Sequence, residues 1–327
     1  MEQLIAAFPQ NIQQAFEAAK ELTFSKPTDK IENIVFVGMG GSGIGAKIVS
    51  KWIENEIDIP VLLFQEYTIP KFVNKHTLFI ACSYSGNTEE TLYSVAQAKE
   101  QGAQIKGICS GGKLEAFCKE NNYDCVVVPG GNPPRTTTAF SIVHIVNLLF
   151  NLELIDKSVL DKVVASTALL ENNITTIKSE AKALAEFLHT KIGVYYASSD
   201  YEAVVIRAKQ QFNENAKELC IGHVIPEMNH NELVGWRDKN DNLAVVLFRN
   251  ETDFRNIQAR MDINKGTFAE YTKTTVEMWS KGTSDLQRAL YLVHIGDWIS
   301  LFLGEKKGVD ITEVKVIDHL KGELAKL

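Results

Sequence analysis

Short apolar runs alternate with longer stretches of helical spacing through the first 150 residues of the chain. Near-continuously apolar runs that are rich in β-branched residues are typical of strands buried on both faces. Helical stretches between such strands predict a parallel sheet covered by helices. The expected strands are 34–37, 61–64, 78–82, 105–109 and 125–128, and the expected helices include 88–101 and 113–122.

Residues 136–190 have helical spacing throughout, and the alternation then restarts. The pattern therefore predicts an α/β protein with two units joined by a long helical connection, and we place the units at residues 1–150 and 151–327. In the second unit the expected strands are 192–196, 243–247 and 274–278, and the expected helices are 202–219, 253–264, 286–303 and 314–324.

Composition narrows the class of protein. The 327 residues are 45% hydrophobic and 23% charged, with a net charge of −7, which is typical of a globular chain and argues against a general nucleic-acid binder. The N-terminal region carries an acid, Glu2, where a signal peptide needs basic residues, and no apolar run has the length of a membrane span. The five cysteines are odd in number and lack CxxC spacing, so we expect reduced thiols in a cytoplasmic protein.

The first expected strand ends in the loop Gly-Met-Gly-Gly-Ser-Gly at residues 38–43. Positions 38, 40 and 43 satisfy the GxGxxG pattern of dinucleotide-binding loops. Glu66 lies near the end of the second strand, where a ribose-binding acid is expected. The loop alone favours dinucleotide binding over the alternative of a tight turn between a strand and a helix that binds no ligand.

The third expected strand ends in Ser-Tyr-Ser-Gly-Asn-Thr at residues 83–88, directly before a helix. Hydroxyl groups and free backbone N–H groups at a helix N-terminus favour an anion. A single N-cap explains one hydroxyl group but not three together with a glycine. We therefore predict a phosphate site, which suits a sugar phosphate better than a dinucleotide; its residues are Ser42, Ser83, Ser85 and Thr88.

These two loops together resemble the sugar isomerase (SIS) domain family. Four further segments resemble the bifunctional phosphoglucose/phosphomannose isomerases, and the match extends from end to end of the chain: Pro133-Pro-Arg135, Phe212-Asn-Glu-Asn215, Pro226-Glu-Met-Asn-His-Asn-Glu232 and Ile317-Asp-His-Leu-Lys321. The resemblance implies two SIS-type α/β/α sandwich domains, each on a mainly parallel sheet of about five strands. It also implies an aldose–ketose isomerase that interconverts fructose 6-phosphate with glucose 6-phosphate and mannose 6-phosphate through an enediol, without metal or cofactor.

The resemblance assigns roles to individual residues. Glu214 is the expected base that moves a proton between C1 and C2. His230 is expected to open the sugar ring in the active site of the partner subunit, which implies a homodimer with shared sites. Lys321 is expected to assist ring opening, and Gly41 to join the phosphate-binding loop. Arg135 follows two prolines that fix its loop, so we expect its guanidinium to stabilise the enediolate or to hold a substrate oxygen.

Other histidines are not assigned to the site. His223 is expected in a turn after Gly222 and is left out. The seven histidines of the chain are scattered and show no metal-ligand spacing, so no metal is predicted.

Several alternatives remain open. The chain could be a sugar-phosphate-binding SIS protein without isomerase activity, an isomerase restricted to glucose 6-phosphate, or an NAD-dependent enzyme that uses the glycine loop. Lys315 and Lys326 compete with Lys321 for the role in ring opening. The small side chain that makes room at C2 is one of four threonines: Thr136, Thr137, Thr138 or Thr312.

Overall fold

The computed structural model describes residues 1–324 and 326. The chain folds into two compact units, which we describe separately. The N-terminal unit contains Ala6–Glu171 and Gly282–Gln287, and the C-terminal unit contains Met1–Ile5, Asn172–Lys281 and the described residues from Arg288 on. The division at residues 150 and 151 stays a prediction about the domains.

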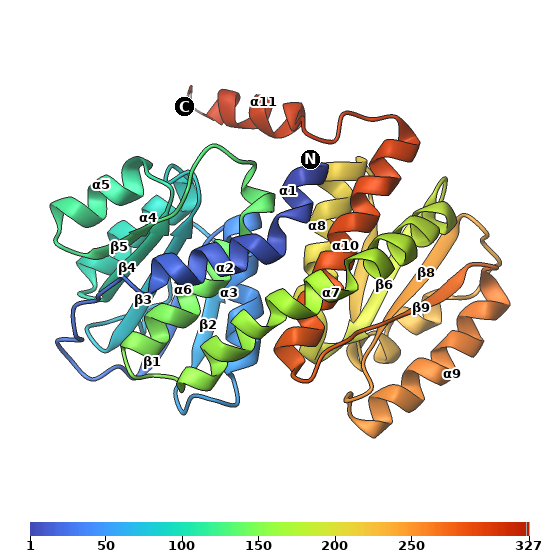
Figure 1. Cartoon of the computed structure of the whole chain (residues 1–327), viewed down its shortest axis with the longest axis horizontal. Helices are drawn as coiled ribbons and strands as arrows, with labels where there is room; N and C mark the ends of the chain where they lie inside the picture. Colours follow the sequence, from blue (N-terminus) through green and yellow to red (C-terminus); the bar gives the residue numbers. More distant parts are fainter. Residues whose placement is uncertain (325, 327) are drawn as a thin grey trace. The chain divides into compact units, whose positions relative to one another are not determined.

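The N-terminal unit is built on a parallel sheet of five strands in the order β2-β1-β3-β4-β5 (Figure 1). The strands run along nearly continuous apolar segments, and β3 is buried over its whole length. Their bounds agree with the expected strands to within about one residue: β1 Asn33–Val37, β2 Val61–Phe64, β3 Thr77–Ser83, β4 Gln104–Cys109 and β5 Asp124–Val127.

Helices cover both faces of this sheet, as the double burial of its strands requires. One face packs on α4 and α5 through a core that includes Phe79, Val95 and Leu114. The other face is covered by α2, α3 and α6 (Figure 1). The bounds of these helices are α2 Phe8–Ala19, α3 Gly40–Ile53, α4 Glu89–Glu100, α5 Gly112–Glu120, the 3-10 helix η1 Pro134–Thr136 and α6 Thr138–Asn151.

The C-terminal unit contains, in its described residues, a parallel sheet of four strands in the order β7-β6-β8-β9. Three of these strands were expected from the sequence, and β7 was not. β7 is an edge strand whose residues are mostly half-exposed, so it lacks the continuous apolar run that marks the central strands. The bounds are β6 Ile192–Ser198, β7 Ile221–Ile225, β8 Leu243–Arg249 and β9 Thr275–Trp279.

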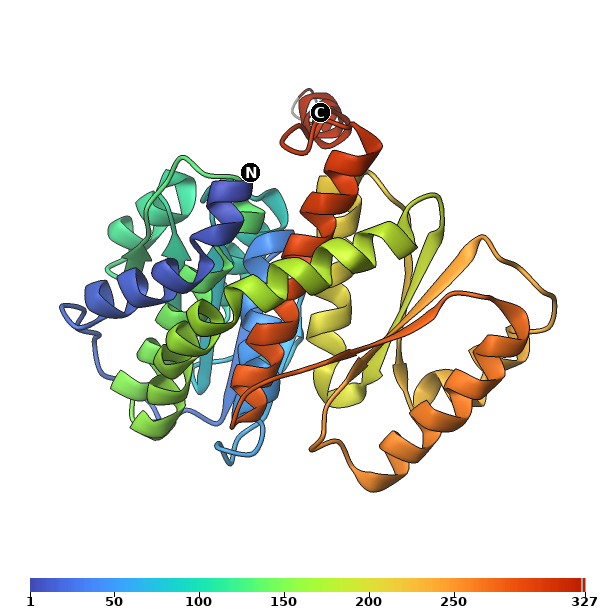
Figure 2. The same ribbon diagram turned by 45° about the vertical axis from the view of Figure 1, so that its right-hand side comes forward.

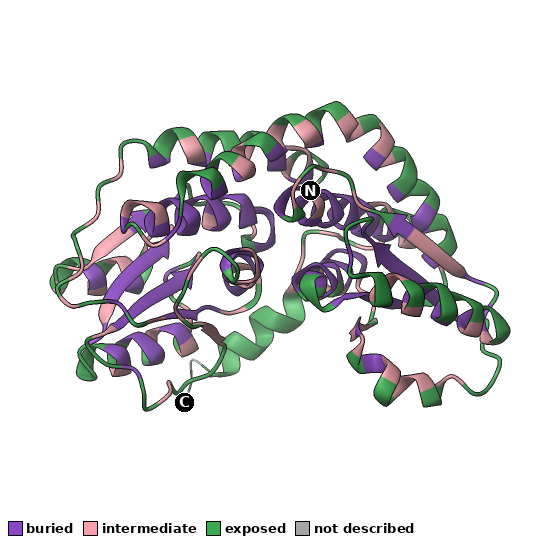
Figure 3. Ribbon diagram, turned by 90° about the horizontal axis from the view of Figure 1, so that it is seen from below, coloured by how far each residue is buried: buried purple, intermediate pink, exposed green. Residues whose placement is uncertain are grey.

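The helices of this unit also lie on both sides of their sheet. One face packs on α9 through Met261 and Phe268, while α8 covers the other face, where Phe212 stacks on Tyr195 with 4.8 Å between the ring centroids. The buried strands and exposed outer helix faces are visible in Figure 3. The bounds are α1 Glu2–Ala6, η2 Ser199–Tyr201, α8 Glu202–Ala216, η3 Glu227–His230, η4 Glu232–Gly235, α9 Arg255–Tyr271, α10 Asp285–Lys307 and α11 Lys315–Leu324.

The long helical connection is present but interrupted, so the expectation of a wholly helical segment over 136–190 is wrong in one place. The helix α6 ends at Asn151, and the 32-residue helix α7, Lys157–Leu188, follows after a turn (Figure 2). Glu153 in that turn has a φ of 60°, which an α-helix cannot contain. No helix in the described part of the chain is both long enough and apolar enough to span a membrane.

Candidate active site

The two predicted phosphate loops lie next to each other in the N-terminal unit. Strands β1 and β3 are direct neighbours, and residues 38–43 and 83–88 follow their carboxyl ends. The order of strands reverses at this pair, because the chain leaves β1 for β2 on one side and returns to β3 on the other. Ligands of open α/β sheets bind at such a reversal. The loops are therefore placed where this fold accepts a ligand.

Hydroxyl groups join the two loops. The backbone N–H of Tyr84 donates a hydrogen bond to Ser42 Oγ at 2.8 Å. Ser83 Oγ, which is fully buried, donates to Thr88 Oγ1 at 2.8 Å. A hydroxyl that accepts one hydrogen bond can still donate its own proton, so Ser42 and Thr88 can each present a donor to an anion.

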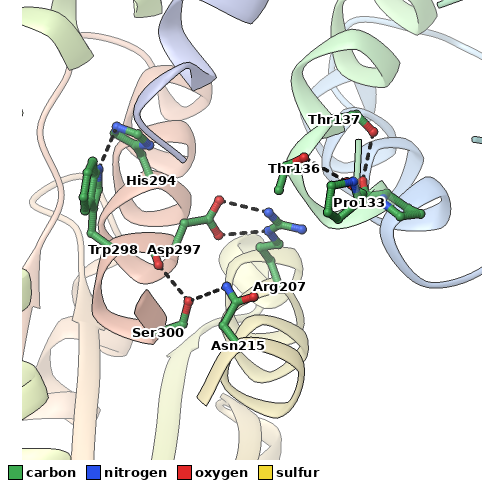
Figure 4. Close-up of polar contacts among 10 residues, drawn as sticks. Pro133, Thr136, Thr137, Arg207, Asn215, His294, Asp297, Trp298 and Ser300 are labelled. Carbon is green, nitrogen blue, oxygen red and sulfur yellow. Dashed lines mark hydrogen bonds and ion pairs between the residues drawn. The ribbon is translucent and has the colours of Figure 1, made fainter. Parts of the chain in front are cut away.

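The first turn of α3 packs closely on η1. A Cβ atom on Gly41 would lie 3.1 Å from the backbone carbonyl oxygen of Pro134 and 3.2 Å from the backbone nitrogen of Arg135. Within η1 the hydroxyl of Thr136 donates to the carbonyl of Pro133 at 2.8 Å (Figure 4). Arg135 is only 3% exposed, so its guanidinium is held in place rather than solvated.

A small pocket lies between the first turn of α3, the ends of β3 and β4, and the start of α6. Three of the predicted phosphate residues line it, Gly41, Ser42 and Ser83, whereas Ser85 and Thr88 do not. The sequence analysis did not assign Thr137 and Ser141 to the anion site, yet both line the pocket. Thr137 could have been predicted as an anion-site residue from the sequence. It directly precedes α6, and a helix N-terminus that follows a strand favours an anion.

Ser85 lies on the outer part of its loop. Its hydroxyl accepts a hydrogen bond from the backbone N–H of Asn87 at 3.2 Å, and its side chain is exposed. The neighbouring Gly86 has a φ of 66°, a conformation that glycine adopts without steric cost. The role of Ser85 in phosphate binding stays a prediction.

The corresponding edge of the C-terminal sheet is different. There Ser198 Oγ donates to the carboxylate of Asp253 at 2.9 Å, and Ser199 Oγ donates to the backbone carbonyl of Ile225 at 3.1 Å. Burial raises the pKa of Asp253. With these hydroxyl groups used internally and a carboxyl beside them, this edge is poorly suited to an anion.

Glu214 lies in the last turn of α8, in the C-terminal unit. Two buried contacts fix this helix on α10 (Figure 4). Arg207 forms a two-pronged ion pair with Asp297, with Nη2 2.9 Å from Oδ2, and Asn215 Nδ2 donates to Ser300 Oγ at 2.9 Å. Because the residues on both contacts are buried, the end of α8 that carries Glu214 is firmly placed.

His230 is the last residue of η3, and its side chain is exposed. The residues before it are anchored: Met228 is fully buried, and Asn229 Nδ2 donates to Asn264 Oδ1 of α9 at 3.0 Å. An exposed imidazole between fixed neighbours can reach a ligand.

The residues after His230 are anchored on the sheet as well. The carboxylate of Glu232 accepts a hydrogen bond from Tyr196 OH and lies 3.3 Å from Nδ1 of His223. Trp236 Nε1 donates to the same tyrosine hydroxyl at 3.2 Å. The expectation that His223 lies in a turn is wrong, because it belongs to β7, where its side chain contacts Glu232.

Lys321 is exposed on α11, and no residue of this helix is buried (Figure 3). Its apolar side chains follow helical spacing, with Val316 83% and Leu320 58% exposed. Glu214, His230 and Lys321 thus lie on three separate elements of the C-terminal unit. Their catalytic roles stay predictions.

The fold and the paired hydroxyl-rich loops define the class of SIS-domain proteins. Residues 29–124 match the SIS domain model, and residues 177–324 match the model described as the bacterial phospho-glucose isomerase C-terminal SIS domain. Among solved structures, the C-terminal domain of glucosamine-fructose-6-phosphate aminotransferase from Francisella tularensis has a TM-score of 0.79 at 16% identity, with 96% of this chain and 98% of that chain covered.

Sequence relatives define the family more closely. The bifunctional phosphoglucose/phosphomannose isomerase of Caldicellulosiruptor bescii is 34% identical, covering 98% of this chain and 97% of that protein. The protein of the same name from Aquifex aeolicus is 36% identical, covering 95% of this chain and 94% of that one. The chain belongs to the family of bifunctional phosphoglucose/phosphomannose isomerases.

Proposed function

We propose that this protein is an aldose–ketose isomerase that interconverts fructose 6-phosphate with glucose 6-phosphate and mannose 6-phosphate. The observation that carries the proposal is identity of 34–36% to proteins of that name over nearly the whole of both chains. The hydroxyl groups of Ser42, Ser83, Thr137 and Ser141, which line one pocket with the start of α3 and the start of α6, support it, because a sugar phosphate needs an anion site made of short donors.

The phosphate group of the substrate binds at the loops of the N-terminal unit in this proposal. Ser42 and Thr88 supply hydroxyl donors, the backbone around Gly41 supplies N–H groups, and the helix N-termini of α3 and α4 favour the negative charge. Ser83 orients Thr88, and Ser85 closes the loop from outside.

The isomerisation itself moves one proton. Glu214 removes the proton from C2 of the aldose and returns it to C1, and the enediol between the two steps carries developing negative charge on oxygen. Arg135 stabilises this charge as a fixed cation. His230 and Lys321 exchange protons with the ring oxygen and the anomeric hydroxyl, so that the cyclic substrate opens before the proton transfer begins.

Glucose and mannose phosphates differ only in configuration at C2. One base serves both when the enediol rotates about the C2–C3 bond and so presents either face to Glu214. The three threonines of the segment 136–138 are buried and small, and Thr312 is exposed, so 136–138 are the better candidates for making room at C2.

We further propose that the active form is a homodimer in which His230 serves the active site of the partner subunit. An exposed histidine between anchored neighbours supports this role, since its side chain is accessible to a ligand. Two alternative functions are an isomerase that acts on glucose 6-phosphate alone and a sugar-phosphate-binding protein without isomerase activity.

A coupled assay tests the proposal. Purified protein is incubated with fructose 6-phosphate, and glucose 6-phosphate and mannose 6-phosphate are followed separately, with and without EDTA. We expect both products at rates that EDTA does not change. Formation of glucose 6-phosphate alone would indicate an isomerase restricted to that aldose. Formation of neither product would indicate a sugar-phosphate-binding protein without isomerase activity.

A further inference from the structure

Lys217 ends α8 in a left-handed conformation, with a φ of 53°. This position after a helix favours glycine, because any Cβ atom there meets steric resistance. A lysine carries a conformational cost at such a position, and the contacts of its side chain have to offset that cost.

The ammonium group of Lys217 joins two segments that are far apart in the sequence. It donates to the backbone carbonyl of Glu214 in the last turn of α8 and, at 2.7 Å, to the backbone carbonyl of Glu313. The carboxylate of Glu313 lies 3.8 Å from the same nitrogen. The carbonyls in the last turn of a helix lack intrahelical partners and carry partial negative charge, so a cation stabilises that turn.

The second segment leads directly into α11. Asp310 Oδ1 accepts hydrogen bonds from the backbone N–H groups of Thr312 and Glu313, at 2.9 and 3.3 Å. The carboxylate of Glu313 in turn accepts the backbone N–H of Lys315, the first residue of α11, at 2.8 Å. Lys217 therefore contacts the residue that holds the start of α11.

Lys307 strengthens the same junction from the end of α10. Its ammonium group donates to the backbone carbonyl of Lys217 at 3.4 Å and pairs with the carboxylate of Glu218. The turn after α8 is thus held from α10 and from the segment 310–313 at once.

We propose that Lys217 is a positioning residue that holds Glu214 in place by tying the last turn of α8 to the segment before α11. The inference rests on the proposed role of Glu214 as the base. Without the ammonium group the Glu214 carbonyl loses this hydrogen bond, so the last turn, although Asn215 still anchors it on Ser300, orients the carboxylate of Glu214 less tightly. A displacement of about 1 Å can lower a rate ~10²-fold.

Two substitutions test this inference. Lys217→Gly removes the side chain and relieves the left-handed backbone, and Lys217→Met keeps an apolar stem without the charge. For both we expect kcat with fructose 6-phosphate to fall ~10- to 100-fold while KM stays within about two-fold. Thr190→Gly is the matched control, because Thr190 has a φ of 68° in the same unit and lies outside this junction. We expect the control to keep its kcat.

Thermal unfolding separates positioning from general destabilisation. Glycine suits the backbone at residue 217, so we expect the Tm of Lys217→Gly to shift by less than about 5 °C. A kcat within two-fold of wild type in Lys217→Gly overturns the inference. A lower kcat in Lys217→Gly together with a normal kcat in Lys217→Met also overturns the inference, because the methionine variant lacks the ammonium group as well.

Glu214→Gln completes the test. If Lys217 acts through Glu214, adding Lys217→Gly to Glu214→Gln lowers the residual kcat less than about three-fold. Full additivity of the two losses contradicts the inference. An inactive wild-type protein, or a Glu214→Gln variant with normal kcat, would instead remove the proposed function or its base, and the inference would fall with it. If Lys217→Gly has a normal kcat and Glu214→Gln is inactive, Glu214 keeps its role as the base and only the positioning role of Lys217 is contradicted.

Discussion

Ser83 donates the proton of its hydroxyl group to the hydroxyl oxygen of Thr88, across 2.8 Å, and the backbone N–H of Thr88 points back to Ser83 Oγ at 3.4 Å. Ser83 ends β3, and Thr88 directly precedes α4. The pair closes the loop and sets the direction in which Thr88 can donate its own proton. Thr88, which accepts the hydrogen bond from Ser83, therefore keeps its own hydroxyl proton for the phosphate in the proposed site.

Replacing Thr88 by valine should raise KM for fructose 6-phosphate by about 10-fold and change kcat little. Valine keeps the shape of threonine but has no proton to donate, and phosphate contacts persist from ground state to transition state. Thr88→Ser is the control and should keep KM within about two-fold. Steady-state kinetics measure both constants. Equal KM values for the valine and serine variants would contradict the role of the hydroxyl.

Glu214→Gln should lower kcat ~10²–10⁴-fold, the usual contribution of a positioned general base. Glutamine keeps the size of the side chain but cannot accept the proton, so binding of the substrate should stay near normal. The losses on glucose 6-phosphate and mannose 6-phosphate should be equal, since one base serves both faces of C2. A variant that lost one activity and kept the other would require two bases.

His230→Ala should lose activity on the cyclic substrate and retain proton exchange at C1 and C2 of the open-chain form. The reason is that ring opening and proton transfer use different groups. Loss of both to the same extent would mean that His230 is not dedicated to ring opening. Kinetics with cyclic substrate and isotope exchange with open-chain substrate separate the two steps.

Mixing the inactive His230→Ala and Glu214→Gln proteins tests the shared site. If His230 serves the partner subunit, hybrid dimers contain one site with both native residues, and part of the activity returns. Mixed proteins that stay as inactive as either variant alone, after subunit exchange has been verified, would contradict the shared site.

One phosphate should bind per chain, although the chain contains two related sheets. The edge of the C-terminal sheet carries Asp253, and the hydroxyl group of Ser198 already donates to it. Isothermal titration with fructose 6-phosphate should give a stoichiometry near one, and Ser83→Ala should weaken that binding while Ser198→Ala leaves it unchanged. Two equivalent sites per chain would contradict this account of the second edge.

Stability should fall as the pH is lowered below neutral, because two histidines are buried. Burial, with a smaller contribution from Lys178, lowers the pKa of His294 to about 3, and burial lowers the pKa of His144 to about 4. The unfolded chain takes up a proton near pH 6.5 at each residue, whereas the folded chain does not. The free energy of unfolding therefore decreases with falling pH, by about 2 kcal/mol for each histidine between pH 7 and pH 5.

Urea unfolding of wild type and His294→Gln at both pH values measures the contribution of His294. Glutamine does not titrate, so the variant should lose about 2 kcal/mol less between the two pH values, whatever its stability at pH 7. The hydrogen bond that Trp298 Nε1 donates to His294 Nε2, at 3.2 Å, agrees with a neutral ring. An identical pH dependence in both proteins would contradict the lowered pKa of His294.

The chemical groups of the candidate site could be read from the chain because they are local. Apolar strands followed by small hydroxyl residues indicated both phosphate loops, and the segments around Glu214 and His230 carried the resemblance to the isomerase family. Sequence periodicity failed at β7, an edge strand with mostly half-exposed residues, and at the turn around Glu153, where the backbone leaves the helix without an apolar break.

The pattern of side chains along the chain determined that this protein is an α/β protein with hydroxyl-rich loops after its first and third strands, because burial and helix initiation are decided by neighbouring residues. Only the tertiary structure decided that β1 and β3 are adjacent, that Thr137 and Ser141 join the same pocket, and that Lys217 connects Glu214 with Glu313. These contacts join residues tens of positions apart. They depend on strand order and helix packing, which no local spacing specifies.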